Sequence, residues 1–170
     1  MGAATAIVVG LVVITPAAGF VSPRGALAMG AIGAVPSYFA ILWRARTRLD
    51  DSLDVLAGHG VGGITGALLT GVFASAAWGG TDGLLHGRPS QLGLQALGVA
   101  VTLGYSTTAT FVLLKLIDLV VPLRAATRAE GVGMDITQHG EEAYSDGEGA
   151  VLVFREPGPA LGSTVKAGAA

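Results

Sequence analysis

The sequence contains no cysteine, few aromatic residues and few charges. Among its 170 residues, aromatic residues make up 6% and charged residues 13%. The absence of cysteine excludes disulfides, thiolate metal ligands and a cysteine nucleophile. Ten basic against twelve acidic residues give a net charge of −2. Because the basic residues are also scattered, no basic surface is available to attract nucleic acid.

Apolar residues are what the chain has in abundance. They make up 51% of the sequence, and the mean hydropathy is +0.63. A water-soluble domain of this size rarely combines so few charges with so high a hydropathy. The composition therefore indicates a membrane protein.

Four uncharged runs are long enough to cross a bilayer, which takes about 18 or more residues as a helix. The runs are residues 2–21, 25–43, 55–81 and 92–114. We therefore predict an all-α fold class, a polytopic bundle of four transmembrane helices. The last helix is expected to continue to about residue 121.

The distribution of arginine predicts the orientation. The connection between the second and third runs and the segment after the fourth hold more arginines than the other two connections, namely Arg44, Arg46, Arg48, Arg124 and Arg128. The positive-inside rule places these segments in the cytoplasm. We expect residues 1–121 to form the transmembrane part and residues 122–145 a cytoplasmic tail. Residues 146–170, rich in glycine, alanine and proline towards their end, form an extra tail that we expect to be disordered.

Small residues recur at every fourth position of two spans, which lets helix backbones approach closely in lipid. On the third span they are Gly58, Gly62, Gly66 and Thr70, and on the second Ala26, Gly30 and Ala34. His59 lies on the stripe beside the first set. We expect the close packing to keep this ring away from lipid.

His59 is a lone ionisable ring at the start of an uncharged apolar run. Such a residue inside a span is a functional-site hypothesis. It is equally consistent with a hydrogen bond to a neighbouring helix, so the residue alone leaves both interpretations open. The carboxylates ahead of it, Asp50, Asp51 and Asp54, are expected to cap the helix N-terminus.

Four ordered motifs run through the chain. They are Ile14–Val21; Asp50–Val55 with Gly58–Gly63; Gln91 and Gln95 with Lys115, Asp118 and Leu123-Arg124; and Gly133-Met134-Asp135 with residues 139–144. Together they cover nearly everything from Gly2 to Tyr144 and resemble the ammonium transporter (ammonium/methylammonium permease) family. The segment around His59 resembles the span that carries the second of the family's two pore histidines.

The resemblance implies that the chain corresponds to the last four of eleven spans plus the cytoplasmic tail, and we expect it to be a C-terminal fragment. The first pore histidine, the outer cation-recruitment site and the aromatic gate belong to earlier spans, so we do not expect the chain to conduct alone. The family further implies a homotrimer in the cell membrane with a cytoplasmic C-terminus. Its cargo would be ammonium or ammonia, with methylammonium as an analogue, and no cofactor is expected.

The same resemblance implies three pore residues. His59 would be half of a pair of neutral imidazoles that take up and relay a proton, Val55 would lie at the inner end of the pore, and Thr15 would line it. The residues themselves also fit an apolar valine and a threonine bonded to its own helix.

In the tail, the resemblance implies a regulatory element that docks on the inner face of the trimer and couples to a PII-type signal protein. Its matching residues are Arg124, Glu130, Gly133, Asp135, His139, Gly140, Glu141 and Tyr144. Pro122 and Val132 depart from the family pattern, so docking contacts are expected to differ. One histidine with Glu141 and Glu142 is a weak metal signal, and we expect no metal site.

Enzyme signatures are missing from the sequence: it has no glycine-rich phosphate loop after a strand, no serine nucleophile elbow and no histidine pair at metal spacing. We therefore expect a transporter subunit and not an enzyme. Two alternatives stay open, a non-conducting truncated subunit with a regulatory or assembly role and an ammonium sensor.

Overall fold

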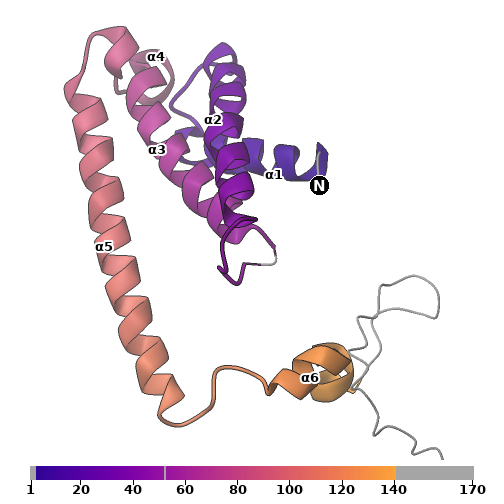
Figure 1. Ribbon diagram of the computed structural model, residues 1–170. Helices are drawn as coiled ribbons and strands as arrows, with labels where there is room; N and C mark the ends of the chain where they lie inside the picture. The colour runs from indigo at the N-terminus through magenta and orange to yellow at the C-terminus, as the bar shows by residue number, and fades with distance from the viewer. Residues whose placement is uncertain (1–2, 52, 141–170) are drawn as a thin grey trace, which may run out of the picture. The chain divides into compact units, whose positions relative to one another are not determined.

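The computed structural model describes residues 3–51 and 53–140, which form helices and turns (Figure 1). The α-helices are α1 Ala3–Ile14, α2 Pro23–Arg44, α3 Gly62–Phe73, α4 Ala76–Gly79, α5 Ser90–Asp118 and α6 Thr127–Val132. The 3₁₀ helices are η1 Thr15–Ala17 and η3 Leu84–His86, and the π-helices are η2 Leu56–Val61 and η4 Asp135–His139. The chain divides into two compact units, residues 1–110 and 111–170.

Three helical stretches are long and apolar enough to cross a membrane. They are α2, the continuous stretch Leu56–Phe73 formed by η2 and α3, and α5. The first predicted span is a shorter apolar helix, Ala3–Ala17. Its α-helical part ends at Ile14 because the residue before a proline is disfavoured in the α conformation and Pro16 lacks an amide donor.

Helix α2 has a defined start and end. Ser22 is its N-cap, with the side-chain oxygen accepting a hydrogen bond from the Gly25 amide at 3.1 Å, and Pro23 takes the first helical position. Proline fits there because its missing amide hydrogen would be unpaired in any case. At the other end the Thr47 hydroxyl donates to the Arg44 carbonyl at 2.9 Å.

Helices α1, α2 and α3 pack against one another and hold the core of the first unit, with α1 crossing the other two (Figure 1). The core residues are Val9, Val13, Ala17, Val21 and Met29, with Leu69 and Phe73 packed against them. Glycines let the helices meet at Val13: Gly33 of α2 faces its side chain and Gly66 of α3 faces its backbone. The close approach of the helices that the small residues predicted therefore occurs at Val13.

The predicted third run, residues 55–81, is not one helix. Helix α3 ends at Phe73, and the next residue, Ala74, has an extended backbone. The Ser75 amide then donates to the Phe20 carbonyl at 2.9 Å, and the Asp82 side chain accepts from the Ala76 amide at 2.7 Å at the start of α4. These bonds turn the chain back before the long helix α5 begins at Ser90.

Helix α5 differs from α2 and α3 in its exposure. All of its 29 residues are described, and none of them is buried. In the second unit, Gly133 and Gly140 are the C-cap residues that follow α6 and η4, and their φ angles are positive, at 118° and 68° respectively. The predicted extra tail, residues 146–170, lies outside the described residues.

Candidate pore segment

The π-helical turn η2 carries His59 and leads directly into α3. A π-helix bonds each amide five residues back and is therefore wider than an α-helix, and such turns are frequent at functional sites. Gly58 and Gly60 flank the histidine, and Gly62 follows. Since glycine has little preference for the α-helix, a glycine-rich sequence loses little by adopting the wider turn.

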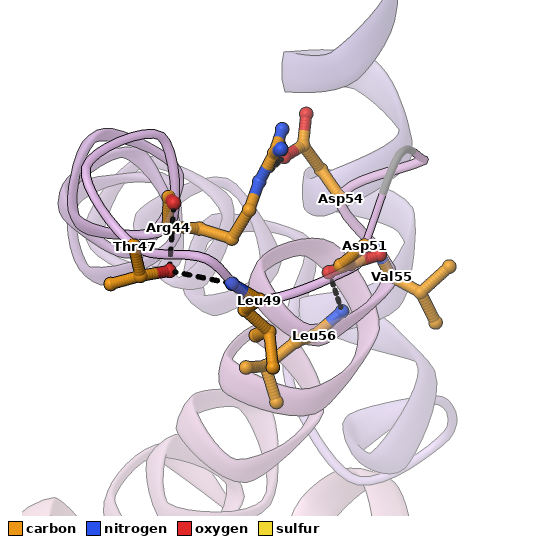
Figure 2. Close-up of polar contacts among 7 residues, drawn as sticks. All are labelled: Arg44, Thr47, Leu49, Asp51, Asp54, Val55 and Leu56. Carbon is orange, nitrogen blue, oxygen red and sulfur yellow. Dashed lines mark hydrogen bonds and ion pairs between the residues drawn. The ribbon is translucent and has the colours of Figure 1, made fainter.

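Asp51 caps this turn, as predicted, whereas the side chain of Asp54, another of the three predicted caps, pairs with Arg44. One of its carboxylate oxygens accepts from the Val55 amide at 2.8 Å and the other from the Leu56 amide at 2.9 Å. Figure 2 shows this side chain beside the start of the turn. Two of the amides that an initial helical turn leaves unpaired are thereby satisfied.

His59 is exposed in this chain. Its neighbours Ala57 and Gly58 are buried instead, in a turn that packs against α1 and α2. The described neighbours of η2 therefore do not cover the ring, and its separation from lipid stays a prediction. The buried stripe is the glycine stripe, and the histidine lies just beside it.

The other two predicted pore residues are also exposed. Val55 is 51% exposed at the entrance of the turn. Thr15 lies in η1, which packs against α3, and its hydroxyl donates to the Leu11 carbonyl at 2.7 Å. A separate groove of about 340 Å³ runs between α3 and the first half of α5, lined in part by Gly63, Ala67 and Gln95, and it contains none of the three predicted pore residues.

Two predicted tail residues come together in the second unit. The Arg124 guanidinium donates to the two Glu130 carboxylate oxygens at 3.0 and 3.3 Å. Gly133 ends α6 beside Asp135. His139 and Gly140 end η4, whereas the predicted residues Glu141 and Tyr144 lie outside the described part of the chain.

An ion pair between Arg44 and Asp54 was not predicted as such. The arginine lies at the end of α2 and the aspartate just before the turn, ten residues later (Figure 2). The signal was available, since an arginine cluster and an aspartate cluster face each other across a short connection. Within residues 3–51 and 53–140, no group of three or more metal-binding side chains occurs.

Long apolar helices that meet at small residues are typical of a multi-pass membrane protein. The glycine-flanked His59 is the feature that points to one family among such proteins. The chain belongs to the Ammonium Transporter Family, which it matches over residues 1–144. It is 47% identical over 146 residues to the ammonium transporter of Aquifex aeolicus, covering 85% of this chain and 34% of that one. It is 39% identical over 145 residues to Ammonium transporter Amt1 of Archaeoglobus fulgidus, covering 85% and 37%.

Solved structures agree with this assignment. The crystal structure of Saccharomyces cerevisiae Mep2 superposes with a TM-score of 0.64 at 32% identity, covering 75% of this chain and 32% of that one. Candida albicans Mep2 gives a TM-score of 0.65 at 31% identity, covering 79% and 32%. The chain spans about a third of the length of the relatives it matches.

Proposed function

We propose that this chain is part of an ammonium channel subunit, in which His59 is one of two pore histidines. The observation that carries the proposal is the place of His59 in a member of this family, on a capped π-helical turn followed by an uncharged helix. The exposed faces of Val55 and Thr15 would line the same pore.

The physical argument concerns the charge of the cargo. Moving a bare ammonium ion into an apolar pore carries a very large desolvation cost, whereas neutral ammonia carries no net charge to desolvate. A neutral imidazole both accepts a proton and offers ammonia a polar contact. His59 would therefore take part in deprotonating ammonium and conducting ammonia.

The pore needs further walls. His59, Val55 and Thr15 are all exposed here. The surface opposite them would come from a part of the subunit that corresponds to the two thirds of the relatives' length that this chain does not match. In that setting the subunits would form a homotrimer in the cell membrane. The tail residues, from Arg124 to Tyr144, would lie in the cytoplasm and respond to a PII-type protein.

A chimera tests this function. The homologous third of the Aquifex aeolicus transporter is replaced by this chain and expressed in a bacterial strain without ammonium transporters of its own. We expect uptake of radiolabelled methylammonium, reduced at least roughly tenfold by His59→Ala, since a tenfold loss corresponds to only about 1.4 kcal/mol in barrier height. His86→Ala, at an exposed histidine in η3, is the matched control. Equal uptake in both variants contradicts the pore role of His59.

The exposure of His59, Val55 and Thr15 also favours a second candidate, a non-conducting subunit with a regulatory or assembly role. In that case the chain binds a complete subunit without adding a pore. Co-purification of the tagged chain with the intact Aquifex aeolicus transporter, together with an inactive chimera, supports this candidate over the first.

A further inference from the structure

The Arg44–Asp54 ion pair joins the end of α2 to the residue before the π-helical turn. The guanidinium Nε and Nη2 both donate to Asp54 Oδ1, at 2.9 and 2.5 Å. The Arg44 side chain is 21% exposed and that of Asp54 only 3%. Figure 2 shows the arginine reaching across the connection to the carboxylate. Two donors on one oxygen fix the orientation of the guanidinium as well as its distance.

Asp54 also has an unusual backbone. Its φ is +54°, and in the part of the chain that the structure describes it is the one residue other than glycine with a positive φ. This left-handed conformation is unfavourable for residues with a Cβ, although aspartate tolerates it better than most. The next residue, Val55, is already helical. The conformation of Asp54 thus sets the direction in which the turn begins.

Net stability does not explain the pair well. Asp54 Oδ2 is buried and finds no hydrogen-bond partner among the described residues. A buried ion pair often gains little over apolar packing, because desolvation offsets the attraction, and its better-attested use is to specify one arrangement. The pair is therefore better explained by the geometry that it imposes.

The turn depends on that geometry because it has little preference of its own. The Gly58 amide donates to the Asp54 carbonyl at 2.8 Å. The residue beside His59 is therefore hydrogen-bonded directly to the aspartate of the ion pair. The glycines at 58, 60 and 62 contribute little intrinsic helix preference. The turn η2 also packs against α2.

We propose that Arg44 and Asp54 are positioning residues: their ion pair holds η2 in register against α2 and thereby fixes the place of His59. Its importance for transport rests on the proposed function. The positioning itself is a property of this chain and is measured without transport.

The test is hydrogen–deuterium exchange, read by mass spectrometry, on the 170-residue chain in lipid nanodiscs. We expect Arg44→Gln to raise the exchange of residues 56–61 by roughly tenfold, as local opening becomes more frequent, while exchange in α5 stays the same. Arg46→Gln, at an exposed arginine two residues further on, is the matched control and leaves η2 unchanged. No rise in η2 with Arg44→Gln overturns the proposal.

The double variant Arg44→Gln with Asp54→Asn separates positioning from charge neutralisation. It leaves no unpaired charge and keeps a residue that tolerates positive φ. We expect exchange in η2 to stay raised, because the bidentate contact is gone; a return to the original exchange overturns the proposal. Arg44→Lys keeps the charge without the fork of donors, so it should give an intermediate rise. If Arg44→Gln does not fold, Arg44→Lys and the double variant still decide the matter.

An uptake measurement in the chimera then separates the two proposals. If Arg44→Gln raises the exchange of η2 but leaves methylammonium uptake unchanged, Arg44 and Asp54 position the turn, and this positioning is not important for transport. An inactive chimera bears only on the proposed function and leaves the exchange result intact.

Discussion

Gly66 in α3 lies directly against the backbone of Val13 in α1, so that a Cβ atom on Gly66 would overlap the Val13 carbonyl oxygen. Because the obstacle is backbone, it cannot be relieved by a side-chain rotation. We expect Gly66→Ala to destabilise the chain by at least about 1–3 kcal/mol, the usual cost of overpacking. The measurement is the free energy of unfolding from an SDS titration in mixed micelles.

Gly63 supplies the control for this prediction. It lies in the same helix, and apart from its chain neighbours and the nearby backbone of that helix, no described atom would come within 4 Å of its Cβ. Gly63→Ala is expected to be neutral or to stabilise by up to about 1 kcal/mol through helix propensity. Similar losses of stability in both variants would show that α1 and α3 are not in close contact.

Gly33 in α2 meets the same valine from the other side, through its side chain. A Cβ on Gly33 would lie 2.5 and 2.6 Å from the two Val13 methyl carbons. We expect Gly33→Ala to destabilise, and Val13→Ala to relieve part of that cost, with a coupling energy of about 1 kcal/mol or more as found for residues in contact. The same Val13→Ala change should not rescue Gly66→Ala. Unfolding of the single and double variants, with Gly30→Ala as a control, measures both expectations.

Ser22 is expected to matter more than Ser75, although both precede helices. The Ser22 side chain accepts a hydrogen bond from the Gly25 amide at 3.1 Å, whereas the Ser75 side chain caps no amide among the described residues. Loss of an N-cap typically costs about 1 kcal/mol. We therefore expect Ser22→Ala to lower the free energy of unfolding by about that amount and Ser75→Ala to change it much less. A larger loss with Ser75→Ala contradicts the assignment of the cap.

On the third span the predicted stripe is the buried one, although the next stripe, with Gly63 and Ala67, also carries small residues and is half-buried. Gly58, Gly62, Gly66 and Thr70 are all buried, which confirms the predicted face. On α2 the prediction is one residue off: the buried residues are Met29, Gly33 and Ser37, and the predicted stripe is half-buried. Two neighbouring stripes of α2 carry small residues, and only the tertiary contact with Val13 selects between them.

The π-helical turn could not be predicted from the residues that form it. A run of glycines permits several helical geometries. The π-helical geometry that this chain adopts occurs together with the Asp51 cap and the Arg44–Asp54 ion pair. The roles of His59, Val55 and Thr15 in a pore stay predictions, since the surface that would face them is not part of the described residues.

Gly133 ends helix α6 with a φ of +118°, and a Cβ there would lie 2.5 Å from an Asp135 carboxylate oxygen. Any residue with a Cβ is strained at such an angle, at a cost on the order of 1–3 kcal/mol. For a helix of only six residues this is enough to shift the local equilibrium towards unfolding. We expect Gly133→Ala to raise hydrogen exchange across residues 127–139 of the full chain and leave α2 unchanged.

Two further variants accompany Gly133→Ala. The first is a comparison within the same helix, and the second separates backbone strain from the clash with the carboxylate. Gly131→Ala, inside α6, should lower exchange in the same residues, because alanine is favoured over glycine in a helix by about 1 kcal/mol. Adding Asp135→Ala to Gly133→Ala removes the clash with the carboxylate but not the strained angle, so exchange should stay raised. If the added change restores the original exchange, the carboxylate and not the backbone angle requires glycine at this position.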